Sequence, residues 1–276
     1  MPRLLGIGDN TVDVYLSEGR MYPGGNAVNV AALSARLGHP ASYVGCVGDD
    51  AAGALILQAL QAEGVDVTRC RQAPGLTSWS AIGHRDGDRY FVGSDAGVQG
   101  HWTLTDDDLT FAAAHDIVHT SIYSRLDDRL PRLRAAARVL SYDFSSEWTP
   151  ALLKGVAPHL DVAFLSAGEG PDAAAQDLAR TVAAHGALVV VVTRGADGSL
   201  AYADGTFTLQ ATVPTQVTDT LGAGDAFITA FLHHWTAHGD VPAALNAGAH
   251  EAARNCTVHG AFGHGAPVPA QHPALS

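Results

Sequence analysis

Two carboxylates six positions apart, Asp219 and Asp225, flank the small residues Gly222, Ala223 and Gly224 in the last quarter of the chain. Apolar residues recur at helical spacing directly after them, which predicts a helix whose N-terminus lies at residues 222–225. Unpaired N–H groups and the positive end of the helix dipole gather at such a terminus and bind anions. A phosphate held there, beside a carboxylate that accepts a hydroxyl proton, suits phosphoryl transfer, so Asp225 is the candidate base. The same residues are also typical of an ordinary capped helix, in which Asp225 only complements the dipole.

A second glycine-rich segment lies near the start of the chain, where Gly24 and Gly25 precede Asn26 and Asn29. Paired glycines at the start of a predicted helix allow the backbone to approach a ligand closely. The two asparagines are three positions apart and therefore share one helix face. An asparagine at a helix start is also a common cap, but the second one, a turn later, favours a polar site for a ligand.

Polar residues also follow the first predicted strand, residues 3–8, at Asp9, Asn10 and Asp13. The carboxyl ends of strands are where open α/β sheets bind ligands, and these side chains offer hydrogen bonds that suit sugar hydroxyls. They are equally able to cap a turn. A dinucleotide-binding fingerprint is excluded because its third glycine is missing and no helix follows at once.

Composition narrows the classes of function. The chain has 276 residues, of which 47% are hydrophobic and 16% charged, and this is typical of a globular protein. A formal net charge of −12 argues against a nucleic-acid or anionic-membrane surface as the main partner and favours a small-molecule ligand. Lys154 is the only lysine, and no P-loop motif occurs, so backbone amides, arginine or a metal must hold any phosphate.

Three cysteines, Cys46, Cys70 and Cys256, and 14 histidines show no spacing typical of metal ligands. An odd number of cysteines suggests reduced thiols and a cytoplasmic protein. The N-terminus has no signal-peptide apolar core, and no apolar run approaches the roughly 18 residues that a membrane span needs.

Strand and helix patterns alternate along most of the chain, which predicts an α/β fold with a doubly wound, mostly parallel central sheet and helices on both faces. Polar residues follow several of the strands at the same edge of that sheet. Glu169 is the candidate ligand for a hydrated magnesium ion, and Thr193, Gly195 and Gly198 are candidates for phosphate contacts. The predicted strands are 3–8, 41–47, 65–70, 116–119, 139–143, 161–165 and 187–193.

The pattern changes at residues 77–83 and 89–93, which alternate in strand fashion around the turn signal Asp86-Gly87. We expect a small sheet from segments at about 14–23 and 76–98 to form a lid that excludes water from the site. Its open face would pair with a second subunit to give a homodimer. We therefore expect a single α/β domain at 1–265 and a loose tail at 266–276.

The segments 24–29 and 219–225, about 190 residues apart, together resemble the two signatures of the ribokinase-like, phosphofructokinase-B type carbohydrate kinases. The resemblance extends from Leu4 to about Phe262. It implies a doubly wound α/β domain with a small β lid that often forms a dimer clasp, and it implies ATP and Mg²⁺ as cofactors.

Individual roles follow from the resemblance by position. Asp225 would deprotonate the sugar hydroxyl, and the anion hole would be formed by Gly222, Ala223 and Gly224. Asp13, Gly25 and Asn29 would hold the sugar, within a wider set of substrate-binding candidates that adds Asp9, Asn10, Gly24 and Asn26. ATP contacts would come from Thr193, Gly195, Gly198 and Gly224, with Asn255 near the adenine. Asp219 would help to bind K⁺.

Two departures from the family pattern bear on the substrate. The N-x-x-E motif becomes Ser166-Ala167-Gly168-Glu169, which keeps the magnesium-linked carboxylate and loses the asparagine. The D-x-N-x-R motif of fructokinases and ketodeoxygluconate kinases becomes Asp143-Phe144-Ser145-Ser146-Glu147, without the arginine. Several strings, Asp116-Ile117-Val118-His119 among them, look most like the fructoselysine 6-kinase branch.

The sequence therefore predicts an ATP-dependent kinase that phosphorylates a primary hydroxyl of a ketose or ketosamine such as fructoselysine. Glu18 and Asp95, near the predicted lid, would accept the ammonium groups of such a substrate, and both are also typical of solvated surface charges. The alternatives are a fructokinase, a ketodeoxygluconate kinase or a nucleoside kinase of the same family, and a non-catalytic sugar or nucleotide sensor.

Overall fold

A sheet of eight strands forms the centre of the protein in the computed structural model, which describes residues 1–85 and 88–275. Six strands are parallel, and two antiparallel strands extend one edge. The strands are β1 (Leu4–Ile7), β4 (Ala41–Val44), β9 (Ile117–Ser121), β10 (Val139–Asp143), β11 (Val162–Ser166), β12 (Val189–Thr193), β13 (Ser199–Ala203) and β14 (Thr206–Gln210), in the order β14-β13-β12-β11-β10-β9-β1-β4. This confirms the predicted fold class.

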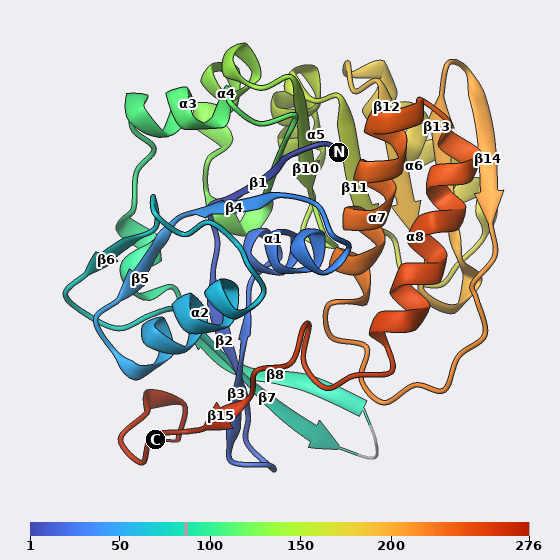
Figure 1. Ribbon diagram of the computed structural model, residues 1–276. Coiled ribbons are helices and arrows are strands. Elements are labelled where there is room, and N and C mark those ends of the chain that lie inside the picture. The colour runs from blue at the N-terminus through green and yellow to red at the C-terminus, as the bar shows by residue number, and fades with distance from the viewer. Residues whose placement is uncertain (86–87, 276) are drawn as a thin grey trace.

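Helices cover both faces of this sheet because neighbouring strand residues are apolar on both sides. Leu4 packs with α7 and α8 on one face, whereas Leu5 belongs to the core on the opposite face, with α4, α5 and α6. Figure 1 shows α1, α7 and α8 in front of the sheet. The α-helices are α1 (Asn26–Arg36), α2 (Ala51–Ala62), α3 (Asp106–Ala112), α4 (Leu130–Ala136), α5 (Pro150–Val156), α6 (Asp172–Ala184), α7 (Ala223–His238) and α8 (Val241–Asn255).

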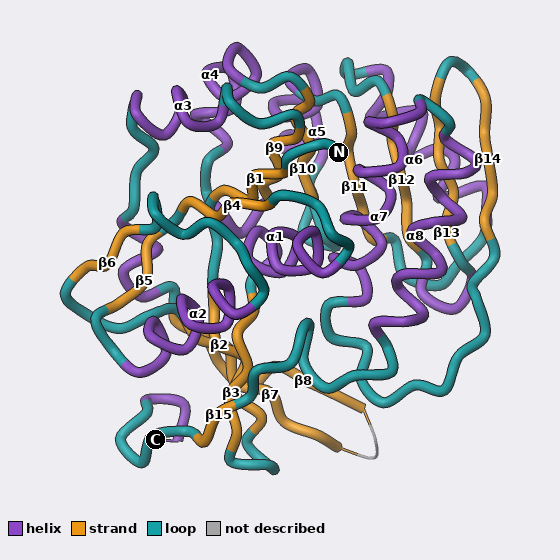
Figure 2. The backbone as a smooth tube through the Cα atoms, in the orientation of Figure 1, coloured by secondary structure: helices purple, strands orange, loops and turns teal. Residues whose placement is uncertain are grey.

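A second, smaller sheet stands at one end of the main body, as Figure 2 shows in orange below α2. It contains β2 (Thr11–Tyr15), β3 (Arg20–Gly24), β7 (Trp79–Arg85), β8 (Asp88–Asp95) and β15 (Ala266–Pro267), in the order β15-β3-β2-β7-β8. The second sheet and its β7–β8 hairpin are thus where the sequence predicts them. The predicted turn itself, Asp86-Gly87, lies outside the described residues.

The chain passes between the two sheets at two places, and both carry predicted site residues. β1 of the main sheet leads directly into β2 of the small sheet through residues 8–10. β3 of the small sheet leads back into α1 at Gly25, whose positive φ of 100° is a backbone conformation that favours glycine. A Cβ at Gly25 would lie 2.6 Å from Cα of Asn10, so only glycine allows these two crossings to touch.

Three expectations about the fold need correction. Residues 41–47 form two strands, because the chain leaves the main sheet at Gly45 and β5 (Cys46–Gly48) pairs instead with β6 (Arg71–Ala73). The predicted strand at 65–70 makes only a single bridge, from Asp66 to Ser42, and the strand follows it at β6. The segment 266–276 is not a loose tail in its described part: β15 pairs with β3, and the ring of His272 packs edge-on against Trp79 at 5.9 Å.

Short 3-10 turns connect several elements. They are η1 (Gly97–His101), η2 (Ile122–Ser124), η3 (Asp127–Arg129), η4 (Ala157–His159), η5 (Gly195–Asp197) and η6 (Pro273–Leu275). Across the described ranges, no helix combines the length and the apolar character that a membrane crossing requires.

Candidate active site

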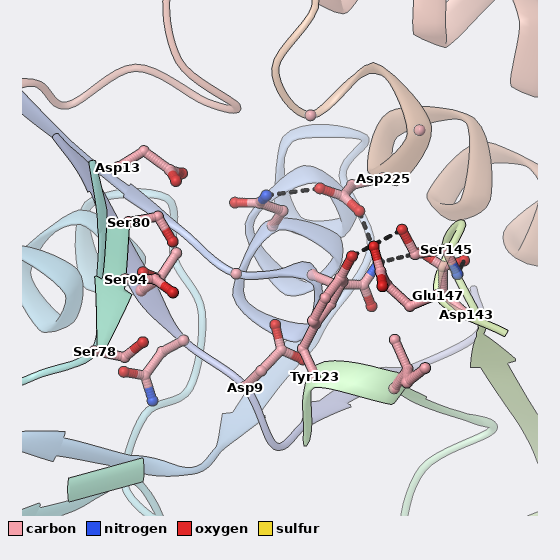
Figure 3. A pocket seen from close by; sticks show the side chains of 18 of the residues that line it. Asp9, Asp13, Ser78, Ser80, Ser94, Tyr123, Asp143, Ser145, Glu147 and Asp225 are labelled. Atoms are coloured by element: carbon pink, nitrogen blue, oxygen red, sulfur yellow. Dashed lines mark hydrogen bonds between the residues drawn. The ribbon is translucent and has the colours of Figure 1, made fainter. Parts of the chain in front are cut away.

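A cavity of about 850 Å³ opens where the carboxyl ends of β1, β9, β10, β11 and β12 face the small sheet. Figure 3 shows Asp13, Ser78, Ser80 and Ser94 on the side of the small sheet, with Asp143, Glu147 and Asp225 across from them. The lining is strongly acidic. Its carboxylates are Asp9, Asp13, Asp95, Asp143, Glu147 and Asp225, whereas Arg125 is the one Lys or Arg among the described lining residues.

Asp225 lies in the first turn of α7, with its carboxylate toward the cavity. Asn26 and Asn29, one turn apart on α1, both donate side-chain N–H groups to it, at 2.7 Å to Oδ1 and 2.6 Å to Oδ2. Both asparagines are buried. Packing of the carboxyl group away from bulk water raises the pKa of Asp225 to about 7, although the two amides oppose this shift and the nearby Asp9 adds to it. A carboxylate with such a pKa is suited to proton transfer near neutral pH.

A second acidic group, Asp143 at the end of β10, shares the amide of Asn26 with Asp225. The Nδ2 atom of Asn26 donates to Asp143 Oδ2 at 3.0 Å, and the backbone N–H of Ser145 donates to Asp143 Oδ1 at 2.8 Å. Burial, and the charges of Asp225 and Asp9, raise the pKa of Asp143. The two carboxyl groups therefore titrate as neighbours, and the charge of each disfavours ionisation of the other.

The loop before α7 is held from several sides. Gly222 caps the helix with a left-handed φ of 76°, and a Cβ there would lie 2.6 Å from Cα and Cβ of Ala261. Asn255 at the end of α8 donates to the Leu221 carbonyl at 3.0 Å. Within the loop, the amide of Ala223 donates to the Thr220 carbonyl at 3.2 Å, so one predicted anion-hole donor already has a partner.

Asp219 is buried and accepts hydrogen bonds from at least three groups, which tie this loop to the small sheet and to residue 260. The donors are the Tyr15 hydroxyl of β2 at 2.8 Å and the backbone amides of Leu221 at 2.9 Å and Gly260 at 3.0 Å. Both carboxylate oxygens thus have partners within the protein. The carboxylate acts here as a structural acceptor that fixes the start of α7.

Residues predicted to bind the substrate meet at the crossings between the sheets. Asp9 is buried and accepts hydroxyl hydrogen bonds from Ser121 and Ser124, both at 2.8 Å. Asn10 uses its amide N–H groups within the protein, toward the Tyr43 hydroxyl and the Cys46 carbonyl, so they do not face a ligand.

Asp13 and Gly24 form a pair on adjacent strands of the small sheet. Asp13 lines the cavity, and a Cβ at Gly24 would lie 2.2 Å from its Oδ2 atom. Gly24 therefore leaves the space that the Asp13 carboxylate occupies. Gly25 also lines the cavity, next to Asn26.

The predicted nucleotide-binding residues lie at the carboxyl end of β12 and in the turn that follows it. Thr193, at the end of β12, lines the cavity. Gly195 and Gly198 follow it in and after η5, and a Cβ at Gly195 would lie 3.7 Å from Cγ of the exposed Glu169. None of these last three residues, nor Asn255, is among the described lining residues. The part of the chain that the structure describes holds no cluster of three or more His, Cys, Asp or Glu side chains able to bind a metal.

The structure adds lining residues that the sequence does not single out. Arg125 follows η2 in a left-handed conformation with φ 55°, and Tyr123 of the same turn donates its hydroxyl hydrogen bond to Ser145 at 2.9 Å. Gln99 of η1 accepts from Asn10. Each lies in a connection of irregular structure, where periodicity gives no signal.

Comparisons with known proteins agree with this arrangement. The model of the "pfkB family carbohydrate kinase" matches residues 5–267. The chain is 40% identical over 269 residues to fructosamine kinase FrlD of Bacillus subtilis, covering 96% of this chain and 94% of that protein. It is 38% identical over 262 residues to fructoselysine 6-kinase of Escherichia coli, covering 95% and 100%. The ribokinase of Arabidopsis thaliana, solved with ribose and ATP, superposes with a TM-score of 0.81 at 24% identity, over 95% of this chain and 94% of that one.

Proposed function

The chain belongs to the pfkB family of carbohydrate kinases, and on that premise we propose that it transfers the γ-phosphoryl group of ATP to the primary hydroxyl of a ketosamine such as fructoselysine. As a member of this family it is a phosphotransferase with an alcohol group as acceptor. Two relatives near 40% identity over almost the whole chain, a fructosamine kinase and a fructoselysine 6-kinase, support the ketosamine as the acceptor.

The observation that carries the substrate proposal is the charge of the cavity. Among the described lining residues are six acidic side chains and one arginine, so the potential of this part of the cavity favours a cationic ligand over a neutral sugar or a sugar acid. A ketosamine carries a protonated amine, whereas fructose is neutral and ketodeoxygluconate is an anion. The last position of the D-x-N-x-R motif, where the related kinases have a phosphate-binding arginine, is Glu147 here, which points in the same direction.

Arg125 suits the other end of such a substrate. A ketosamine formed on an amino acid keeps a free carboxylate, and a guanidinium binds carboxylates through paired hydrogen bonds. No hydrogen bond or ion pair joins Arg125 to another residue in the described ranges, although it stands in an acidic cavity. We propose that Arg125 pairs with the carboxylate of the amino-acid part.

The proposed reaction uses groups that the fold already orients. Asp225 would accept the proton of the acceptor hydroxyl as its oxygen attacks the γ-phosphorus of ATP and the bond to the β-phosphate oxygen breaks. The first turn of α7, with Gly222 and Gly224, would hold the developing negative charge through backbone amides and the helix dipole. The hydrogen bonds from Asn26 and Asn29 keep the base in place, which lowers the cost of orientation.

Magnesium fits the donors at the nucleotide end. Mg²⁺ usually keeps several waters and binds through one or two carboxylates and the substrate phosphates, and the exposed Glu169 beside Gly195 offers such a carboxylate. Bound there, the ion would neutralise phosphate charge. Potassium at Asp219 fits less well, because both oxygens of that carboxylate already accept hydrogen bonds.

A homodimer through the small sheet is the assembly that we propose. β8 is an edge strand of that sheet, and Val92 on it is 54% exposed. Open edges and exposed apolar side chains are features by which strands pair with a second chain. Because ATP is the proposed phosphoryl donor, we expect the enzyme to act in the cytoplasm.

An ADP-coupled assay tests the proposed function. The purified protein would be incubated with ATP and Mg²⁺ and with fructoselysine, fructose, ketodeoxygluconate, ribose or adenosine, each with and without K⁺. We expect kcat/KM to be highest for fructoselysine, by at least about tenfold. Sugar binding without ADP release for every acceptor would support a sensor, and turnover of adenosine alone would support a nucleoside kinase.

A further inference from the structure

His119 lies directly behind the candidate base, although it touches neither Asp225 nor the cavity. It belongs to β9 at the middle of the main sheet, and its side chain is fully buried. Its Nε2 atom lies 2.8 Å from the Asn26 carbonyl oxygen Oδ1, and its Nδ1 atom lies 2.8 Å from the Ser141 hydroxyl. A continuous chain of hydrogen bonds thus runs from Ser141 through His119 and Asn26 to Asp225.

The direction of this chain follows from the chemistry of its members. The amide nitrogen of Asn26 faces Asp225 and Asp143, two carboxyl groups that accept its N–H donors, so the carbonyl oxygen must face His119. A carbonyl oxygen only accepts, and Nε2 therefore carries the imidazole proton. Burial lowers the pKa of His119 to about 3, so the ring is neutral and Nδ1 accepts from the Ser141 hydroxyl.

The imidazole therefore selects one orientation of the Asn26 amide. Turned by half a rotation, the side chain would set its NH₂ group against the Nε2 proton and its carbonyl oxygen against two carboxylates. Asn29 has no comparable partner among the described residues, because its Oδ1 atom is buried without a hydrogen bond. The two asparagines that hold the base thus differ: only Asn26 is supported from behind.

We propose that His119 is a positioning residue for phosphoryl transfer, which acts through Asn26 to hold Asp225 as the ionised base. This inference rests on the proposed function, in which Asp225 takes the proton from the acceptor. A hydrogen bond to the ionised form of a carboxyl group favours that form, so a correctly held Asn26 keeps more of Asp225 ionised at neutral pH. Loss of the His119 contact would make the base harder to ionise.

Other charged groups also bear on Asp225, and the test must separate them from His119. Asp9 faces it from the β1–β2 crossing and Asp143 from the end of β10, and both oppose its ionisation. Arg125 and Glu147 line the same cavity farther out along their loops. None of these four residues makes a hydrogen bond to His119 in the described ranges, so replacement of His119 leaves them in place.

The experiment is the pH dependence of kcat/KM for fructoselysine in wild type, His119→Met and His119→Gln. Methionine fills much of the volume without a donor, and the acid limb should move up by about one to two pH units, which is the shift expected for loss of a hydrogen bond to a charged group. Glutamine places an N–H donor near the Nε2 position, and we expect it to recover at least half of that shift. Ser141→Ala, which frees the Nδ1 atom, should shift the limb in the same direction by less.

The outcomes distinguish this inference from the proposed function. If Asp225→Asn keeps wild-type turnover, the base is misassigned and the proposed function fails. If Asp225→Asn is inactive while His119→Met and Ser141→Ala keep the wild-type acid limb, the inference alone is overturned. Should His119→Met not fold, the Ser141→Ala profile decides: an upward shift supports the proposal, and an unchanged limb refutes it.

Discussion

Replacement of Asp225 by asparagine is expected to abolish turnover and to raise the stability of the protein relative to wild type as the pH increases from 5 to 8. The substitution is nearly isosteric and removes the carboxylate that would accept the proton. General-base catalysis typically contributes a factor of about 10²–10⁴, so kcat should fall by at least about a hundredfold. Nucleotide binding should change little, because the proposed ATP contacts Thr193, Gly195 and Gly198 lie at and after the end of β12 and not at Asp225.

The gain in stability follows from the raised pKa. An unfolded aspartate titrates near pH 3.9, whereas Asp225 titrates near pH 7 in the folded protein. Between these values the folded state binds more protons than the unfolded state, so the wild-type free energy of unfolding falls as the pH rises through this window. Asparagine has no such titration. The stability of the variant relative to wild type should therefore increase from pH 5 to pH 8, by about 1–3 kcal/mol once screening by water in the cavity is allowed for.

Urea unfolding of both proteins at pH 5 and pH 8, followed by tryptophan fluorescence, measures this difference, and the coupled assay measures kcat. The reasoning would be refuted by a variant that retains more than about a tenth of wild-type turnover. It would also be refuted by a stability difference that is the same at both pH values, since the carboxyl group would then titrate as it does in the unfolded chain. Asp107→Asn, at an exposed position in α3 outside the cavity lining, is the matched control.

Three further substitutions test neighbouring parts of the site. Gly222→Ala should lower kcat/KM by at least about tenfold and lower the Tm, because the added Cβ meets Ala261 and strains a left-handed residue; a normal kcat would contradict the role of this turn. Arg125→Gln should raise KM for fructoselysine by about tenfold or more and leave KM unchanged for a ketosamine made from a simple alkylamine; equal effects on both would exclude carboxylate recognition. Asp143→Asn should move the acid limb of the pH profile to lower pH, because it removes a negative charge beside Asp225; an upward shift would contradict their coupling.

The parts of the fold that the sequence predicts well have a clear pattern of apolar residues. β9, β10, β11 and β12 are short apolar runs with polar residues at their ends, and α7 follows a helical repeat from Ala226 to Trp235. The strand prediction fails where the path of the chain depends on three-dimensional packing. Residues 41–47 are mostly apolar, and nothing in their pattern shows that the chain leaves the main sheet at Gly45.

Two other differences have related causes. The hairpin β13–β14 is absent from the prediction, because its strands are short and its turn, Asp204-Gly205, is the only local signal. The C-terminal segment is rich in Pro, Ala and Gly, a composition typical of loose tails, yet Ala266 and Pro267 pair with the edge strand β3. The open edge of β3 exists only once the small sheet has formed, so the sequence of the C-terminal segment does not show this pairing.

The candidate site also has a part that the sequence predicts and a part that only the structure shows. Motifs place Asp225, Asn26 and Asn29 in one cavity although they are almost 200 positions apart, and the structure adds the hydrogen bonds that join them. Asn10 illustrates the limit, since its residue type suits a sugar but its amide N–H groups bond within the protein. His119 stands at a predicted strand end, and its contact with Asn26 appears only when β9 and α1 are packed together.

A crystal structure of the protein with fructoselysine and a non-hydrolysable ATP analogue tests the central claim most directly. The terminal phosphate should lie against the first-turn amides of α7, with the primary hydroxyl of the sugar within about 3 Å of the Asp225 carboxylate. A terminal phosphate bound elsewhere, or an acceptor hydroxyl turned away from Asp225, would contradict the account.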